Sequence, residues 1–220
     1  MAHAIYVFDG YGTLFDVHAA VRRHADTVGP EGQLLSALWR AKQLEYSWML
    51  TMMGRYRDFW SLTEEALDYA FARVPEANRA SRGALLEAYW KCDVFPDVPE
   101  VLKQLKLRGA KLVVLSNGTQ AMLEAACRSG GIDDVVDEIL SVEEVKVYKP
   151  DPRVYDLVTT RHRCFPDAVS FQSSNRWDAA GATAFGFRSV WINRNALPEE
   201  YDAFRPAAVL PSLDGLLTLG

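Results

Sequence analysis

The chain has 220 residues, of which 49% are apolar and 24% are charged, and it carries a net charge of −5 at pH 7. This composition is typical of a globular protein that buries a core without disulfides, in one or two domains. The negative charge argues against nucleic acid as a partner, because phosphate contacts need clustered Lys and Arg side chains.

The cysteines and the N-terminal residues indicate the cellular compartment in which the protein is expected. Cys92, Cys127 and Cys164 are odd in number and lack C-x-x-C spacing, so we expect neither a disulfide framework nor a zinc site. No apolar run approaches the ~18 residues of a membrane span, and residues 1–4 lead into an apolar run without a signal peptide. We therefore expect a cytoplasmic protein with no membrane partner.

Short apolar runs alternate with helical ones along most of the chain, which predicts an α/β protein with a parallel sheet. The predicted strands span residues 5–8, 111–115, 168–171 and 189–192, with a short edge strand at 207–210. Each is almost continuously apolar, as expected for strands that are covered on both faces.

The segment 17–92 differs from the rest of the chain, because it has helical periodicity and no strand-like run. Leu38, Trp48 and Met52 are examples of this periodicity. We predict a Rossmann-like core domain of residues 1–16 and 94–220, with a helical cap domain of residues 17–93 inserted after the first strand.

An aspartate follows the first predicted strand directly. Asp9 stands in a glycine-rich turn, at the strand end where open parallel sheets bind ligands. A carboxylate in such a place can attack carbon and form an ester, which divides one difficult step into two easier ones. The alternative is an aspartate that only caps a turn or a helix.

Four motifs follow one another in the chain: DGYGTLFD at residues 9–16, LSNG at 115–118, YKPD at 148–151 and SSNRWD at 173–178. In this order they resemble the haloacid dehalogenase superfamily, and within it the L-2-haloacid dehalogenases, from residue 3 to about residue 193. The resemblance implies a hydrolase of carbon–halide bonds, an (S)-2-haloacid dehalogenase. Asp9 would attack C2 of an L-2-haloalkanoic acid with inversion, and hydrolysis of the aspartyl ester would release a D-2-hydroxy acid and halide.

We expect no metal and no cofactor. A magnesium site needs several oxygen ligands, and the positions expected for them in the first and last motifs hold only two carboxylates, Asp9 and Asp178. Tyr11 stands where phosphate-transferring relatives carry a second aspartate, and Asn175 stands where a further carboxylate would be useful. Halide leaves as a stable anion without a proton, so Tyr11 is free to form a wall of the pocket.

The resemblance assigns roles to a set of residues. Arg40 and Asn117 would receive the halide, where preorganised donors stabilise developing charge. Asp178 would hold Lys149 or position the hydrolytic water. The expected catalytic residues are Asp9, Thr13, Arg40, Ser116, Asn117, Lys149, Tyr155, Ser173, Asn175 and Asp178. The expected substrate-binding residues are Tyr11, Arg40, Leu44, Phe59, Ser116, Asn117 and Trp177.

Thr13 and Ser116 would orient Asp9 or the substrate carboxylate by hydrogen bonds, and Tyr155 would support the site around Lys149. An ammonium at Lys149 would keep Asp9 ionised and attract the anionic substrate.

Each of these residue types also has an ordinary structural role. Arg40 and Lys149 could be solvated surface side chains, Ser173 and Asn175 could cap a helix, and Phe59 could belong to the core. Two residues depart from the family pattern: Ala41, where glutamine is usual, and Arg176, where a small residue is expected.

Two rival functions remain open at the level of the sequence. One is a magnesium-dependent phosphatase of the same superfamily, and the other is a non-catalytic carboxylate-binding homologue. For the favoured function, the expected partners are a small anionic 2-haloacid, water and halide, with a second copy of the chain in a homodimer. No residue type selects a preferred halogen or chain length, including activity on fluoroacetate.

Overall fold

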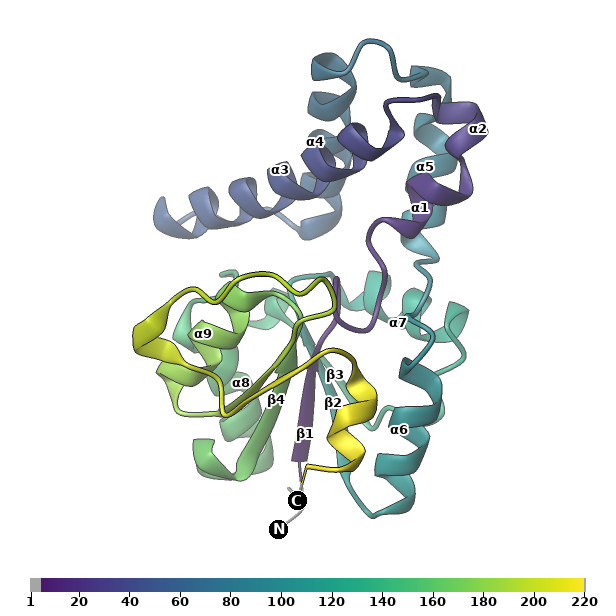
Figure 1. The fold of residues 1–220 in the computed structure, drawn as a ribbon. Helices are drawn as coiled ribbons and strands as arrows, with labels where there is room; N and C mark the ends of the chain where they lie inside the picture. Colours follow the sequence, from purple (N-terminus) through teal and green to yellow (C-terminus); the bar gives the residue numbers. More distant parts are fainter. Residues whose placement is uncertain (1–4, 220) are drawn as a thin grey trace.

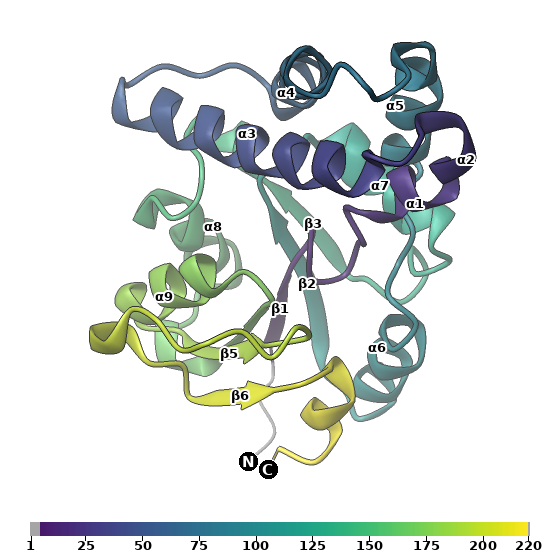
Figure 2. The same ribbon diagram turned by 45° about the horizontal axis from the view of Figure 1, so that its top comes forward.

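A parallel sheet forms the centre of the protein, which a computed structural model describes over residues 5–219. Its six strands lie in the order β3-β2-β1-β4-β5-β6, and all five strand pairs are parallel (Figure 2). The strands are β1 (Ile5–Asp9), β2 (Lys111–Ser116), β3 (Glu138–Ser141), β4 (Val169–Ser173), β5 (Arg188–Ile192) and β6 (Ala208–Leu210). The predicted α/β fold with a Rossmann-like parallel sheet is confirmed.

Helices cover both faces of this sheet. The helices are α6 (Val98–Leu107), α7 (Gln120–Ser129), α8 (Pro152–His162) and α9 (Arg176–Phe185). Helices α6 and α7 lie on one face, and α8 and α9 lie on the other (Figure 1). Val7 of β1 pairs with Val113 of β2 and Phe171 of β4, and all three side chains are fully buried. Strands enclosed in this way read as continuous apolar runs.

Strand β3 was not predicted from the sequence. Its four residues begin with Glu138, and only Leu140 and Ser141 are buried. It lies at the edge of the sheet beside β2. Because one of its edges has no neighbouring strand, it lacks the apolar run that identifies the central strands.

Five helices follow β1 and lie beyond the carboxyl ends of the strands (Figure 1). They are α1 (Ala19–Arg23), α2 (Ala25–Val28), α3 (Gly32–Met52), α4 (Phe59–Arg73) and α5 (Arg82–Trp90). Two chain segments connect them to the sheet, and Asp16 N–H donates to Asp93 O at 2.7 Å between these segments. The division of the chain into two domains, with boundaries after residues 16 and 93, stays a prediction. Within residues 5–219, no helix combines the length and apolarity needed to cross a membrane.

Candidate active site

The carboxyl edge of the sheet gathers polar residues from three neighbouring strands. Asp9 ends β1, Ser116 ends β2 and Ser173 ends β4. Because β1 lies between β2 and β4, these residues meet at one edge, beneath helices α1–α5 (Figure 1). Loops before α8 and α9 add Lys149 and Asn175.

The two oxygens of the buried Asp9 carboxylate have different surroundings. Oδ2 accepts three hydrogen bonds, from Thr13 Oγ1 at 3.0 Å, Ser173 Oγ at 3.1 Å and Asn175 Nδ2 at 2.7 Å. Oδ1 accepts one, from Lys149 Nζ at 3.1 Å. The three bonds to Oδ2 fix the orientation of the carboxylate, while Oδ1 keeps a lone pair that can react.

Asn175 stands at the N-cap of α9, but its side chain does not cap the helix. Its Nδ2 donates to Asp9 Oδ2 and to Tyr11 O, the latter at 3.1 Å. The role of a simple helix cap is therefore wrong for this side chain. The helix lacks a side-chain cap, which would stabilise it by about 1 kcal/mol. The amide of Asn175 holds the Asp9 carboxylate instead.

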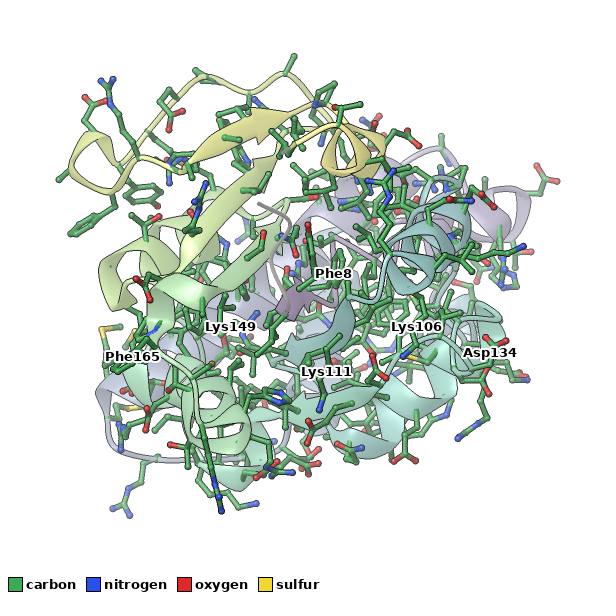
Figure 3. All side chains as sticks on the ribbon, turned by 90° about the horizontal axis from the view of Figure 1, so that it is seen from below. Phe8, Lys106, Lys111, Asp134, Lys149 and Phe165 are labelled. Carbon is green, nitrogen blue, oxygen red and sulfur yellow. The ribbon has the colours of Figure 1, made fainter. Side chains whose placement is uncertain are left out.

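Lys149 lies buried between two carboxylates. Its Nζ is 3.1 Å from Asp9 Oδ1 and 2.9 Å from Asp178 Oδ2, and its side chain is 1% exposed. By contrast, Lys111 at the start of β2 is exposed; both lysines are labelled in Figure 3. Burial lowers the pKa of Lys149, but the charges of Asp178 and Asp9 outweigh it and raise the pKa above its ordinary value. The alternative of a solvated surface lysine is wrong.

Asp178 is fully buried and uses both of its carboxylate oxygens. Oδ2 accepts from Lys149 Nζ, and Oδ1 accepts from Tyr155 Oη at 2.7 Å. Burial raises the pKa of Asp178 to about 6, although the Lys149 charge and the Tyr155 hydroxyl act in the opposite direction. Asp178 therefore holds Lys149, and a pKa near neutrality suits a group that accepts a proton from water.

Tyr11 and Arg40 bring unused hydrogen-bonding groups to the site. Arg40 Nη2, from α3, donates to Tyr11 O at 3.1 Å. Within residues 5–219, Arg40 Nη1 and Tyr11 Oη are buried without a hydrogen-bond partner. Burial raises the pKa of Tyr11 well above its usual value, so the ring lines the site as a neutral phenol. Both groups are therefore available to donate hydrogen bonds to a ligand or to water.

Aromatic rings surround Tyr11. Its ring stacks on Tyr89 at 5.3 Å and lies 6.1 Å from Phe59. The sequence analysis predicted Phe59 as a residue of this pocket but did not identify Tyr89. Helical periodicity alone cannot distinguish a pocket residue such as Tyr89 from an ordinary core residue. Leu44 is half-buried one turn after Arg40 on α3.

The side chains of Ser116 and Asn117 each accept a hydrogen bond from a backbone N–H group. Ser116 Oγ accepts from Gly118 N–H at 3.3 Å, and Asn117 Oδ1 accepts from Lys149 N–H at 3.0 Å. In the described part of the chain, the hydroxyl groups that donate to Asp9 are those of Thr13 and Ser173, and not that of Ser116. Contact between Ser116 and a substrate carboxylate stays a prediction.

Arg176 is buried although a small residue was expected at its position. Its Nε donates to Glu199 Oε1 at 2.5 Å, and its Nη2 donates to Phe204 O at 3.1 Å. The guanidinium thereby ties the segment 199–204 to the start of α9. Ala41, the second departure from the family pattern, is exposed on α3.

A parallel sheet in which one central strand ends in a buried aspartate, with a buried lysine beside that carboxylate, is typical of one class of hydrolases. The chain belongs to the haloacid dehalogenase-like hydrolases, because the model of that family matches residues 3–186. It is 48% identical to (S)-2-haloacid dehalogenase 1 of Pseudomonas sp. (strain CBS-3), over 91% of this chain and 88% of that protein.

Solved structures agree with this placement. A crystal structure of a dehalogenase with an intermediate complex is 44% identical and superposes with a TM-score of 0.96, covering 99% of this chain and 96% of that one. The L-2-haloacid dehalogenase of Xanthobacter autotrophicus with chloropropionic acid covalently bound is 33% identical, with a TM-score of 0.87 over 100% and 98% of the two chains. The resemblance to the L-2-haloacid dehalogenases is therefore confirmed.

Proposed function

We propose that the protein is an (S)-2-haloacid dehalogenase, which converts L-2-haloalkanoic acids to D-2-hydroxy acids and halide. The observation that carries this proposal is the asymmetric setting of Asp9. Its Oδ2 is held by three donors, while its Oδ1 faces the Lys149 ammonium and keeps a free lone pair. The covalent chloropropionate complex of the Xanthobacter relative supports an ester mechanism.

In the first step, Asp9 Oδ1 attacks C2 in line with the carbon–halogen bond. The bond between Oδ1 and C2 forms, the carbon–halogen bond breaks, and its electron pair leaves with the halide, so C2 is inverted. The unpartnered Nη1 of Arg40 receives the halide together with Asn117, since donors aimed at developing charge stabilise the transition state. Lys149 and the hydroxyl proton of Ser116 attract the substrate carboxylate.

In the second step, water attacks Cγ of Asp9, the bond between Cγ and Oδ1 breaks, and the D-2-hydroxy acid leaves with one proton of that water on its hydroxyl oxygen. Esterification at Oδ1 makes Oδ2 the carbonyl oxygen, and its three donors then stabilise the oxyanion that forms there. Asp178, whose pKa is raised by burial, accepts the other proton of the water and then releases it to solvent. The oxygen of the product hydroxyl therefore comes from Asp9, and the oxygen of water stays in the enzyme carboxylate.

The pH dependence tests the role of Asp178. We expect kcat of the wild type to fall toward low pH, because a protonated Asp178 cannot accept a proton. Esterification removes the Asp9 charge that helps to raise the pKa of Asp178, so this acid limb should lie below the value of about 6 of the free enzyme. The Tyr155 hydroxyl lowers the pKa of Asp178, so Tyr155→Phe should move this acid limb to higher pH. Tyr69→Phe, on the half-exposed surface of α4, is the matched control and should leave the limb in place. An unshifted limb in Tyr155→Phe would contradict the assignment.

Metal independence, a cytoplasmic location and a homodimer belong to the same proposal. The ammonium of Lys149 occupies the space between Asp9 and Asp178, the two carboxylates on which a cation would depend. Exposed apolar side chains on α3, including Leu34 and Met49, support association of two copies. The relatives do not favour a magnesium-dependent phosphatase or a non-catalytic carboxylate-binding protein.

A chloride assay tests the function directly. Pure protein incubated with L-2-chloropropionate and EDTA should release chloride, at a rate within about two-fold of the rate with added magnesium. The D-enantiomer is the matched control and should release none. Chloride release that EDTA abolishes and magnesium restores would contradict metal independence. Folded protein that releases no chloride under either condition would contradict the proposed function.

A further inference from the structure

Helix α3 directs one stripe of side chains toward the loops at the carboxyl edge of the sheet. The stripe consists of Arg40, Leu44, Trp48 and Thr51. Successive members are four, four and three residues apart, which places them on one face of the helix. From the first member to the last, the helix rises about 16 Å. This face therefore spans the distance from Arg40 to the loop that carries Lys149.

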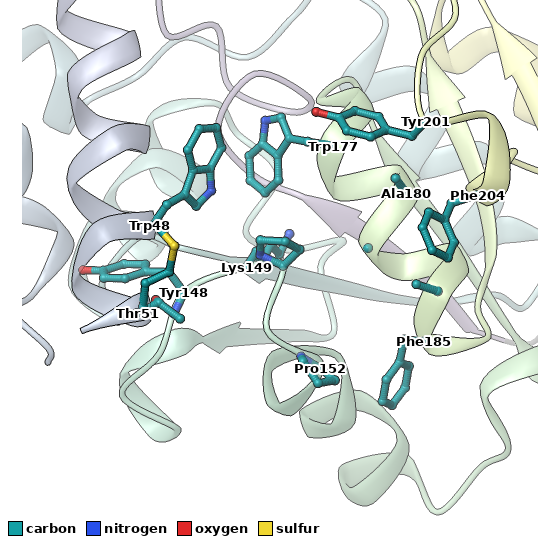
Figure 4. Close-up of a pocket in the computed structure, with 14 residues that line it drawn as sticks. Trp48, Thr51, Tyr148, Lys149, Pro152, Trp177, Ala180, Phe185, Tyr201 and Phe204 are labelled. Carbon is teal, nitrogen blue, oxygen red and sulfur yellow. The ribbon is translucent and has the colours of Figure 1, made fainter. Parts of the chain in front are cut away.

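Hydrogen bonds hold this face of α3 at two points. Arg40 Nη2 donates to Tyr11 O at 3.1 Å, in the loop that follows β1. At the end of the helix, Thr51 Oγ1 accepts from Tyr148 N–H at 3.0 Å, one residue before Lys149. Figure 4 shows Thr51 beside Tyr148, with Lys149 in the same view. The helix thus links the loop of the nucleophile to the loop of the buried lysine.

The side chain of Tyr148 makes a second connection between the same parts of the chain. This side chain is fully buried, and its Oη donates to Arg57 O at 2.5 Å, a residue 91 positions away in the sequence. The ring stacks on Tyr56 at 5.5 Å and lies 6.0 Å from Phe59. The segment 51–59, which runs from the end of α3 to the start of α4, therefore packs around the residue that precedes the buried lysine.

The backbone of Lys149 has a further partner in the site. Its N–H donates to Asn117 Oδ1 at 3.0 Å. Two consecutive backbone N–H groups, those of Tyr148 and Lys149, thus bond to side chains, one on α3 and one in the loop after β2. Because Lys149 Nζ lies 3.1 Å from Asp9 Oδ1, a shift of this backbone moves the ammonium relative to the nucleophile.

Aromatic packing lies between the two hydrogen bonds of α3. The rings of Trp48 and Trp177 meet edge to face at 5.4 Å, and both are labelled in Figure 4. Trp177 precedes Asp178, which accepts from Lys149 Nζ. Ring contacts of this kind tolerate small rotations, whereas a hydrogen bond weakens steeply when its angle departs from linearity. The acceptor at Thr51 therefore defines the position of the loop more narrowly than the rings do.

We propose that Thr51 is a positioning residue of the dehalogenation reaction. By accepting from Tyr148 N–H, its hydroxyl oxygen fixes the backbone that carries Lys149. The proposal rests on the proposed function, in which Lys149 attracts the substrate carboxylate and Arg40 receives the halide. These two side chains contact opposite ends of one small molecule, so their separation decides whether C2 lies in line with Asp9 Oδ1. A misplacement of about 1 Å lowers a rate by about 100-fold.

A single turnover with enzyme in excess tests this role. The measured quantity is the first-order rate constant of bromide release from (S)-2-bromopropionate, which does not depend on the fraction of the protein that is folded. Thr51→Val keeps the shape of the side chain but offers no acceptor, and should lower this rate constant by about ten-fold or more. Thr51→Ser restores the oxygen and should return the rate constant to near the wild-type value. Thr27→Val, at an exposed position of α2, is the matched control and should leave it unchanged.

A second variant tests the same connection with Thr51 in place. Tyr148→Phe removes only the donor to Arg57 O and should also lower the rate constant, whereas Tyr69→Phe, on α4, should not. A wild-type rate constant in Thr51→Val, whatever its stability in urea, overturns the positioning role. Thr51→Ser that stays as slow as Thr51→Val overturns it too. If Thr51→Val does not fold, an unchanged rate constant in Tyr148→Phe overturns the role. Wild-type protein that releases no bromide overturns the proposed function, and this role with it.

Discussion

Replacing Asp9 with alanine should lower kcat/KM for L-2-chloropropionate by about 10⁴-fold or more, the scale seen when a nucleophile is removed. Asp9 Oδ1 supplies the electron pair of the new bond, and no second carboxylate can take its place. Asp178 is the other acid of the site, and both of its oxygens are already bonded, to Lys149 and Tyr155. The measurement is steady-state chloride release with protein of verified fold.

The matched control for this change is Asp134→Ala, which removes an aspartate from the exposed surface. It should leave kcat/KM within about two-fold of the wild type. If Asp9→Ala retained more than a hundredth of the wild-type value, Asp9 would not be the nucleophile.

Single turnover in heavy-oxygen water tests the same step without a mutation. Water attacks Cγ of Asp9 in the ester, so the label should enter Asp9 first, and the product of that first turnover should carry unlabelled oxygen. Labelled product in the first turnover would show that water attacks C2 directly, with Asp9 as a general base.

The central sheet and the gathering of the motifs could be predicted from the sequence. Most residues of the central strands are apolar, and a polar residue ends three of these strands: Asp9, Ser116 and Ser173. A parallel sheet brings such residues to one edge whatever the details of the loops. The edge strand β3 was not predicted, because only two of its four residues are buried.

The hydrogen-bond partners of individual side chains were less predictable, because several acceptors can compete for one donor. Asn175 could have capped α9, and only the three-dimensional proximity of Asp9 shows why it does not. The buried face of α3 also departs in part from the apolar periodicity of the segment. Met52 is 72% exposed, while the polar Gln43 is buried, since its Nε2 donates to Thr63 Oγ1 at 2.9 Å. Apolar periodicity cannot identify a buried position that a hydrogen bond satisfies.

Lys149→Met should lower both activity and stability. We expect kcat/KM to fall by about 10³-fold or more, because the site loses the positive charge beside Asp9 that attracts the anionic substrate. The free energy of unfolding at pH 8 should fall by about 3–5 kcal/mol, because two buried carboxylates are left without the ammonium between them. Chloride release and urea unfolding measure the two effects. Lys111→Met, at an exposed position, is the control and should change neither.

The pH dependence separates the structural effect of this change from the catalytic one. Burial already raises the pKa of Asp178 to about 6, and loss of the Lys149 charge, which lowers it, raises it further. The folded variant then binds a proton more tightly than the unfolded chain, so its stability should rise as the pH falls from above 6 toward 4. Much of the lost stability should therefore return at pH 5, where Asp178 is neutral. Activity should not return, because the ammonium that faces Asp9 Oδ1 is still missing. Equal destabilisation at pH 5 and pH 8 would show that Lys149 does not compensate the buried charge of Asp178.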